Sequence, residues 1–568
     1  MYVYSELSFD HYGTPAPGCL YKYRKYQWDN SRILSKPFLT LGLARRSRCW
    51  SWFLWGSEAD TTALTTIQPP VSPSEGTSEA DAEPVQAEWF LFQHAAVILR
   101  AEIGQVLCSR LPVSGSSVTS TTMYTFFDSD FFHFEFLRVL GTAPFEGCDI
   151  GECLEAIACI KNHDPESWFD AWAAAGRKAE SVAVTAEKRG DREAARWAWI
   201  RSGNYFRAAE YMLHCTPKDA RLLETLEHSV CNFQRGFALL ADPAGHGGEV
   251  LSLEVPYEHG LTLPAYLFMP LREAGSMEPV PVVVNSGGFD STQEELYFYV
   301  AAGARRRGYA VLTFDGPGQG IFHRRLDQQA GFPDQAPEGA YMRHDWEAVI
   351  RPVLDRLWAY SEQNQHLHLD LDRVSIFGES MGAYFALRGA GDPRIKACIA
   401  MDGFYDMWDI ADSRIPPVFL KAWDRLGDRF FDRVIRSLGR VHFRTRFEFA
   451  HARFALGLAT YAQATRAFQR FSLRGDGEHG EYLARVQCPV FVTGALDWAY
   501  FPAQGNATKI YDVLSRLHPG KAKLWVAKGV GSGGLQAKVA AISTVHDKTF
   551  EWLDEVLKID RKGEKCLP

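Results

Sequence analysis

The feature that most constrains the fold is a series of short apolar segments between residues 249 and 527. The first two segments alternate polar and apolar residues like antiparallel strands, and the later ones are separated by stretches with helical spacing. Such alternation implies right-handed crossovers and a mostly parallel sheet covered on both faces. The sequence therefore predicts an α/β fold, with strands within residues 249–257, 261–269, 279–288, 309–320, 373–380, 395–404, 488–497 and 521–527.

Two segments outside this series have the spacing of helices. From 150 to about 240, apolar residues recur three and four positions apart, and we expect breaks at 190–191 and 202–204. The segment between the strands at 395–404 and 488–497 has a similar pattern. We expect a helical N-terminal cap domain at 123–244, a catalytic domain at 245–404 and 486–560, and a helical lid at 405–485; the alternative for the lid is extra surface packing.

The N-terminal part has a different texture. Residues 61–87 are rich in Thr, Pro, Ser and acidic residues, so they cannot bury enough surface to order themselves. From Met123 onwards, aromatic residues become dense. We therefore expect residues 1–122 to be a low-order extension, either a gene-model artefact or a disordered arm.

Composition excludes several classes of function. The formal net charge is -8 without a basic tract, which argues against a nucleic-acid partner. No run of about 18 uncharged apolar residues and no signal-peptide pattern is present, so we expect a cytosolic protein without a membrane span. The 11 cysteines are scattered. Cys148, Cys153 and Cys159 are therefore expected to be buried thiols rather than zinc ligands, and no metal or cofactor is expected.

The stretch Gly378-Glu-Ser380-Met-Gly382 follows a short apolar strand and precedes a helical run. A nucleophile on a sharp strand-to-helix turn has strained dihedrals, and its neighbours two residues away must lack bulk. The α/β-hydrolase fold places such a serine at the carboxyl end of a central strand. Ser380 is therefore the expected nucleophile.

An oxyanion hole is expected beside this serine. In the hydrolase arrangement one donor is the backbone N–H after the nucleophile, here Met381, and the other comes from the loop after an earlier strand. The loop 285–291 supplies Gly288, which permits close backbone approach, and Phe289, whose N–H is the second donor.

A triad acid should end a later strand. Asp497 ends the strand at 488–497, whereas the competing Asp512 lies within the helix expected at 503–516. Asp402, Asp406 and Asp409 are expected to cap or salt-bridge the lid.

Four motifs together resemble a known family: GGFDS (287–291), FDGPGQG (314–320), GESMG (378–382) and TGALD (493–497). The chain is similar to the fungal α/β-hydrolases of fusarin and cytochalasan biosynthesis, which act alongside polyketide synthase–nonribosomal peptide synthetase hybrids. It is more distantly similar to pigment-pathway hydrolases that shorten a polyketide and to bacterial pseudooxynicotine hydrolases. The resemblance implies a helical cap, Ser380 as nucleophile, Asp497 as acid and a small-molecule polyketide substrate.

The general base is where the sequence departs from this pattern. In the distant relatives a Gly-rich turn after the last strand carries the histidine, but residues 528–543 contain none. His546 is the next candidate. If the last helix begins near Leu535, His546 lies about 16 Å along its axis, which favours an ordinary helix-surface histidine. His323 is a conceivable alternative base, and His518 lies on the wrong edge of the sheet.

The functional expectation is an enzyme that tailors a polyketide or polyketide–amino acid intermediate, by lactam or pyrrolidone ring formation or by acyl hydrolysis. Two alternatives stay open. One is a catalytically degenerate hydrolase fold that acts as a binding or scaffolding protein, and the other is a C–C bond-cleaving hydrolase that shortens a polyketide. A homodimer is a further option.

Overall fold

The computed structural model describes residues 124–561, apart from 274, 331–336, 338, 476–479 and 498–500. The extension expected at 1–122 lies outside these residues. Within the described ranges, no helix is long and apolar enough to cross a lipid bilayer.

A single eight-stranded sheet forms the centre of the catalytic domain, in the order β1-β2-β4-β3-β5-β6-β7-β8. β1 pairs with β2 and β2 with β4 in antiparallel fashion, and every other neighbouring pair is parallel. All eight predicted strands are present, and the predicted mostly parallel α/β-hydrolase sheet is confirmed. Their bounds are β1 Val250–Pro256, β2 Thr262–Phe268, β3 Val280–Ser286, β4 Ala310–Phe314, β5 Leu369–Glu379, β6 Ala397–Met401, β7 Val490–Ala495 and β8 Ala522–Ala527.

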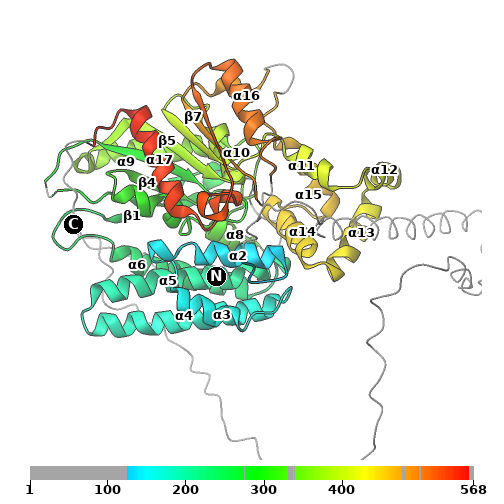
Figure 1. The fold of residues 1–568 in the computed structure, drawn as a ribbon, viewed down its shortest axis with the longest axis horizontal. Helices are drawn as coiled ribbons and strands as arrows, with labels where there is room; N and C mark the ends of the chain where they lie inside the picture. Colours follow the sequence, from blue (N-terminus) through cyan, green and yellow to red (C-terminus); the bar gives the residue numbers. More distant parts are fainter. Residues whose placement is uncertain are drawn as a thin grey trace, which may run out of the picture. The chain divides into compact units, whose positions relative to one another are not determined.

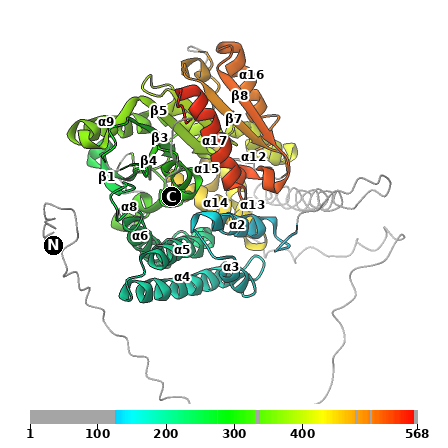
Figure 2. The same ribbon diagram turned by 60° about the vertical axis from the view of Figure 1, so that its left-hand side comes forward.

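Helices cover both faces of this sheet, because the inner strands are apolar on both sides. On one face, alternate strand residues such as Val284 and Ile376 form a core with α9 (Glu347–Gln363), α10 (Met381–Gly389) and α16 (Ala507–Leu517). On the other face, the neighbouring residues Val283 and Phe377 pack with the π-helical turn η5 (Tyr297–Ala301), α7 (Ala302–Arg305) and α17 (Ile542–Leu557). Figures 1 and 2 show α17 lying across this second face.

The segment before the sheet forms a helical layer. It contains α2 (Asp130–Leu140), α3 (Ile150–Ile157), α4 (Pro165–Lys188), α5 (Arg192–Tyr211) and α6 (Arg221–Ala238). Aspartates start three of these helices, because Asp149, Asp164 and Asp191 each accept hydrogen bonds from the first-turn N–H groups. The layer contributes Phe233 and Phe237 of α6 to the second core of the sheet.

The helix break expected at 190–191 is present, but the break expected at 202–204 is wrong. Residues Ser202 to Asn204 lie inside α5 and are used for close helix packing. A Cβ on Gly203 would lie 2.7 Å from the Phe233 ring of α6, and the Ser202 hydroxyl donates to the Gly176 carbonyl of α4. Small and polar residues that are typical of a turn therefore let three helices approach each other.

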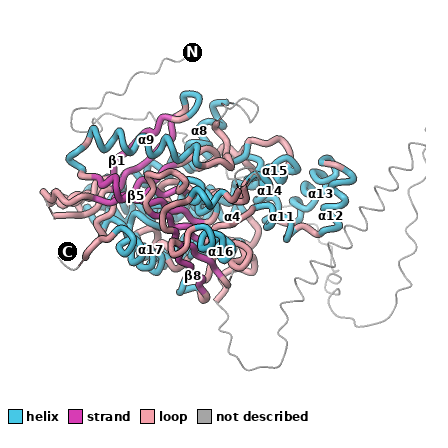
Figure 3. Tube along the Cα trace, turned by 90° about the horizontal axis from the view of Figure 1, so that it is seen from above, coloured by secondary structure: helices cyan, strands magenta, loops and turns pink. Residues whose placement is uncertain are grey.

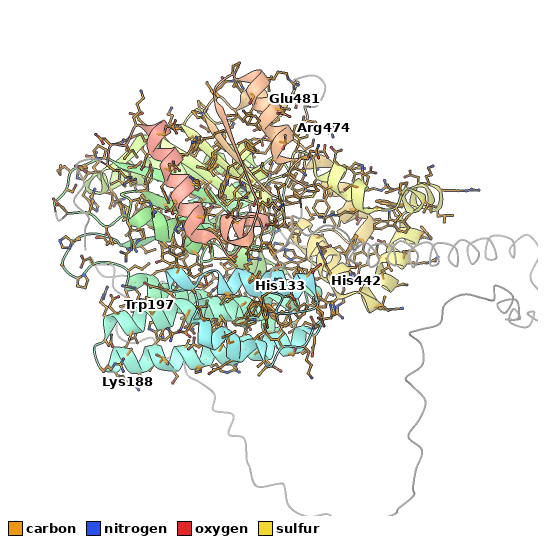
Figure 4. The ribbon with its side chains drawn as sticks, viewed as in Figure 1. His133, Lys188, Trp197, His442, Arg474 and Glu481 are labelled. Carbon is orange, nitrogen blue, oxygen red and sulfur yellow. The ribbon has the colours of Figure 1, made fainter. Side chains whose placement is uncertain are left out.

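Among its described residues, the segment between β6 and β7 forms five α-helices: α11 (Met407–Arg414), α12 (Pro417–Leu426), α13 (Asp428–Val441), α14 (Phe443–Leu456) and α15 (Tyr461–Ala467). Figure 3 shows them gathered on one side of the sheet. Phe443 and Phe447 of α14 join the core of the helical layer, and Phe447 lies 5.0 Å from Phe131 of α2 between ring centroids. Figure 4 labels His133 on α2 and His442 at the start of α14. α8 (Gly320–Ala330) follows β4.

Candidate active site

Ser380 stands on a strained turn between β5 and α10. Its backbone has φ 56° and ψ -120°, and its N–H donates to the Met401 carbonyl at 2.8 Å. A Cβ on Gly378 would lie 1.9 Å from the Gly382 carbonyl oxygen, and one on Gly382 would lie 2.4 Å from the Ser286 carbonyl oxygen. The glycines are therefore required by backbone contacts, as the spacing of the motif predicted.

The loop after β3 is held rigidly beside this turn. The Gln319 side-chain amide donates to the carbonyls of Gly287 at 2.8 Å and Gly288 at 2.6 Å, and the Gly288 N–H donates to the Ser291 hydroxyl. In a trans peptide the carbonyl of Gly288 and the N–H of Phe289 point in opposite directions. The two hydrogen bonds from Gln319 thus fix the direction of the Phe289 N–H, and they give the FDGPGQG motif a physical role.

A cavity of about 450 Å³ is lined by Ser380, Met381, Gly288 and Phe289. Its wall comes from the helical layer, the catalytic domain and the helices between β6 and β7. Apolar side chains dominate this wall. The aromatic members are Phe131, Phe134, Tyr211, Phe289, Tyr299, Phe419, Phe431, Phe447, Phe449, Phe468 and Phe501. The size and character of this cavity are typical of a small-molecule site.

Asp497 does not line this cavity. Its side chain is exposed and accepts a hydrogen bond from the Gly529 N–H at 2.5 Å, while its own N–H donates to the Gly534 carbonyl. A Cβ on Gly534 would lie 1.9 Å from the Asp497 carboxylate. Asp497 therefore braces the Gly-rich turn after β8, and any side chain at Gly534 would collide with it.

His546 is also placed away from Ser380. The expectations that the last helix begins near Leu535 and that His546 lies on its surface are both wrong. α17 begins at Ile542, and the imidazole is buried with its Nε2 donating to the Phe298 carbonyl at 2.9 Å. Burial lowers the pKa of His546 to about 4, so the ring is neutral near pH 7.

The other histidines considered as bases have structural partners. His323 is buried with its Nε2 3.0 Å from the Phe454 carbonyl, and His518 bonds the Leu483 carbonyl. Neither residue lines the cavity that contains Ser380.

An ion pair occupies the region between the ends of β6, β7 and the segment after β8. The Lys538 ammonium lies 2.7 Å from the Asp402 carboxylate and also donates to the Gly494 carbonyl, and both side chains are almost completely buried. Asp402 therefore does not cap or salt-bridge the lid, contrary to expectation. Asp406 does cap α11, and both it and Asp409 pair with Arg474; Figure 4 shows Arg474 near α16.

Sequence reasoning missed His451, the histidine of α14 that lines the cavity. Its Nε2 lies 3.3 Å from the Phe289 carbonyl, and a carbonyl can only accept, so the ring proton is on Nε2. The Nδ1 atom is buried without a partner among the described residues. Burial lowers the pKa of His451 to about 3, so the neutral ring positions the oxyanion loop but is a weak base.

A second missed group is a cluster of charges from the helical layer. Arg138 of α2 donates to both carboxylate oxygens of Glu295, at 2.6 and 2.5 Å, and lies 3.3 Å from Glu135 and 3.5 Å from Asp290. Burial raises the pKa of Glu135 to about 7. Arg138, Glu135 and Asp290 all line the cavity, which therefore has one polar end. No local pattern in the sequence connects α2 with the loop after β3.

The comparisons with known proteins agree with this geometry. A model of the alpha/beta hydrolase family matches residues 282–533, and an esterase FrsA-like model matches residues 156–338. The crystal structure of 2,6-dihydroxy-pseudo-oxynicotine hydrolase superposes with a TM-score of 0.54 over 74% of this chain and 95% of that chain, at 20% identity, which supports the fold.

Two curated relatives are much closer in sequence. Hydrolase LUC6 of a Fusarium species is 46% identical over 77% of this chain and 99% of its own length. The 20-hydroxy-prefusarin hydrolase FUS2 of Gibberella moniliformis is 44% identical over the same shares of the two chains. These matches confirm the resemblance that the four motifs predicted. The chain therefore belongs to the alpha/beta hydrolase family of enzymes, in the group that includes these two fungal hydrolases.

Proposed function

We propose that the protein is an enzyme of fungal secondary metabolism that acts on a carbonyl group of a polyketide or polyketide–amino acid intermediate. The observation that carries the proposal is the largely apolar cavity lined by Ser380 together with Met381 and Phe289, whose backbone N–H groups are the proposed oxyanion donors. The name of FUS2, a 20-hydroxy-prefusarin hydrolase, supports a substrate of this class.

The oxyanion donors carry most of the proposed chemistry. Backbone N–H groups directed at a carbonyl oxygen stabilise the negative charge that develops there, and removing water strengthens that interaction. Ser380 contributes less, because a hydroxyl near its free pKa is a poor nucleophile without an adjacent base. We therefore propose lactam or pyrrolidone ring formation through a stabilised enolate as the main reaction. In it the enolate carbon attacks a second carbonyl carbon of the same open-chain amide, a C–C bond replaces the C–H bond, and the proton released from carbon ends on the attacked oxygen by way of water. Slow acyl hydrolysis through Ser380 is the second candidate.

Asp497 and His546 are proposed to have structural roles rather than to complete a triad. Asp497 forms hydrogen bonds with Gly529 and Gly534 in the turn after β8. His546 forms a hydrogen bond with the Phe298 carbonyl on the other side of the sheet from α10. A purely scaffolding role is opposed by the strained conformation of Ser380, which would confer nothing on a scaffold.

Deleting the gene in a producing strain and profiling its metabolites tests the proposal. We expect loss of a ring-closed product and accumulation of an open-chain polyketide amide, and expression of the Ser380→Ala variant separates the two reactions. Ring closure that survives Ser380→Ala supports the enolate route, whereas loss of product supports an acyl-enzyme. An unchanged metabolite profile after deletion would contradict the proposal. A cytosolic location and a homodimer are further proposals that fractionation and light scattering can test.

A further inference from the structure

We infer that Glu379 and Gln536 form a subsite within the Ser380 cavity that binds a carboxamide group through its N–H and its C=O. The subsite rests on the proposed function only in that the carboxamide would belong to the polyketide–amino acid substrate. Both side chains line the cavity, and each is at most 4% exposed.

Gln536 presents a fixed hydrogen-bond acceptor. Its Nε2 donates to the Asp402 carbonyl at 2.6 Å, and this bond determines which end of the side-chain amide is which, because a carbonyl only accepts. The other end of the Gln536 side-chain amide is therefore the Oε1 atom. This atom is buried without a partner among the described residues. A buried acceptor left unpaired is costly, so a donor from a ligand would be stabilised there.

The backbone around Gln536 is held firmly. Ala537 and Lys538 both have positive φ, 52° and 55°, and the buried Lys538–Asp402 ion pair fixes this turn to the ends of β6 and β7. The backbone of this turn cannot move away without breaking the pair, and the hydrogen bond to the Asp402 carbonyl holds the Gln536 side chain in place on it. The acceptor is thus part of a rigid wall.

Glu379 presents the complementary donor. Both of its carboxyl oxygens are buried, and neither has a hydrogen-bond partner on another residue in the described ranges. The groups that face it are Arg138 from α2, Asp290 and Glu295 from the loop after β3, and Tyr299 from η5. Arg138 is already engaged by both oxygens of Glu295, so it only partly offsets the effect of burial on the pKa of Glu379.

These surroundings favour the protonated form of Glu379. Burial, followed by the negative charge of Glu295, raises the pKa of Glu379 well above its ordinary value. A neutral carboxyl has an O–H group, which can donate to a carbonyl oxygen as in other sites where an acid is kept protonated at neutral pH. One donor and one acceptor in the same cavity match the C=O and N–H of a carboxamide.

The rest of the wall makes this match selective. An ester lacks the N–H that Gln536 needs, and a tertiary amide lacks it as well, and the rest of the cavity wall is dominated by apolar side chains. A polar group that enters an apolar cavity without a partner loses its hydration uncompensated. Sites built to bond an N–H discriminate against analogues that lack it.

The test is direct binding by calorimetry to the full chain, with octanamide, N,N-dimethyloctanamide and methyl octanoate as probes. We expect octanamide to bind the wild type about tenfold more tightly than the dimethyl analogue, the range expected when one buried acceptor is left unpaired. The Gln536→Leu variant should lose this preference, and Glu379→Leu should weaken octanamide binding by about tenfold. Glu379→Gln, which keeps a donor, should bind octanamide nearly as well as the wild type.

The matched control is Thr465→Val. Thr465 also lines the cavity, but its hydroxyl already donates to the Tyr461 carbonyl at 2.8 Å. This variant should keep the preference for octanamide. Circular dichroism establishes that each variant is folded, and the comparison of the two amides on the wild type requires no variant.

Equal affinity of the wild type for the two amides, absence of octanamide binding, or an unchanged preference in folded Gln536→Leu would each overturn the inference. These outcomes are independent of metabolite profiling. A preference for octanamide together with an unchanged metabolite profile would leave the subsite standing and remove the proposed function. The reverse pair of results would remove the subsite alone.

Discussion

The site around Ser380 has two sides that differ in structure. On one side, the strained turn of Ser380, the loop at Gly287 to Phe289 and the Gln319 brace retain every steric feature that an oxyanion hole needs. On the other side, where a hydrolase places its acid and histidine, Asp497 bonds a glycine turn instead. The site thus has the groups that stabilise negative charge, whereas among the described residues no histidine is hydrogen-bonded to Asp497.

The second side is held together by buried interactions. There the segment after β8 carries the buried Lys538–Asp402 pair and the rigid turn that presents Gln536 to the cavity. A buried charge pair costs desolvation, and it persists only where its geometry and further hydrogen bonds compensate. This comparison teaches that a wall fixed by the buried ion pair stands where the hydrolase pattern predicts a histidine, and such a wall suits binding and carbonyl polarisation better than ester hydrolysis.

The largest effect is expected on the second side of the site, from the loss of its buried ion pair. Replacing Lys538 by Ala leaves the Asp402 carboxylate buried without its cation, and we expect the free energy of unfolding in urea to fall by about 3 to 5 kcal/mol. The matched control is the double variant Lys538→Met with Asp402→Asn, since Asn tolerates the positive φ of Asp402. It should recover most of the loss. Equal destabilisation by both variants would show that the pair does not hold this wall together.

The next largest effect is expected on the first side of the site, at the oxyanion loop. Gln319→Leu removes both hydrogen bonds to the carbonyls of Gly287 and Gly288, so the Phe289 N–H is no longer held in one direction. We expect the rate of labelling of Ser380 by a fluorophosphonate, or of ring closure, to fall by about one hundredfold. Gln463→Ala, which alters an exposed capping box of α15, is the control and should leave the rate unchanged. An unchanged rate in folded Gln319→Leu would remove its positioning role.

These two predictions also indicate how far sequence reasoning reaches. The strands, the Ser380 turn and the glycines of the oxyanion loop were predictable because each is dictated by local periodicity or by contacts between residues close in sequence. His451 and Arg138 were not, because each lies in a helix of ordinary apolar spacing and reaches the cavity only through packing between distant segments. Gln536 was hidden for a different reason. Its unpaired Oε1 atom depends on the fold of the turn after β8, and no pattern in the sequence predicts it.

A smaller effect concerns the pH dependence of stability on the face of the sheet opposite α10. The folded pKa of His546 is about 4, below the 6.5 of the unfolded chain, so the unfolded state binds more protons and stability is lost as the pH falls below 6.5. At pH 5 this amounts to about 2 kcal/mol. The His546→Leu variant should lose correspondingly less stability than the wild type between pH 7 and 5, as measured by urea unfolding. Its fluorophosphonate labelling should match that of the wild type, and abolished labelling would restore His546 as the base.

The smallest expected effect is the most decisive for the comparison. Asp497→Asn keeps an oxygen that can accept from the Gly529 N–H at an exposed position, so the free energy of unfolding should change by about 0.5 kcal/mol or less. If Asp497 only braces the turn, labelling of Ser380 and hydrolysis of p-nitrophenyl acetate should change by less than about twofold. In a working Ser-His-Asp triad the same substitution lowers kcat by about 10⁴, because the imidazole loses its correct tautomer. A rate measured on the variant at pH 7, beside the wild type and Ser380→Ala, separates these outcomes by several orders of magnitude. A large loss would mean that a histidine reaches Asp497 during turnover, and the contrast between the two sides of the site would then belong to the resting enzyme only.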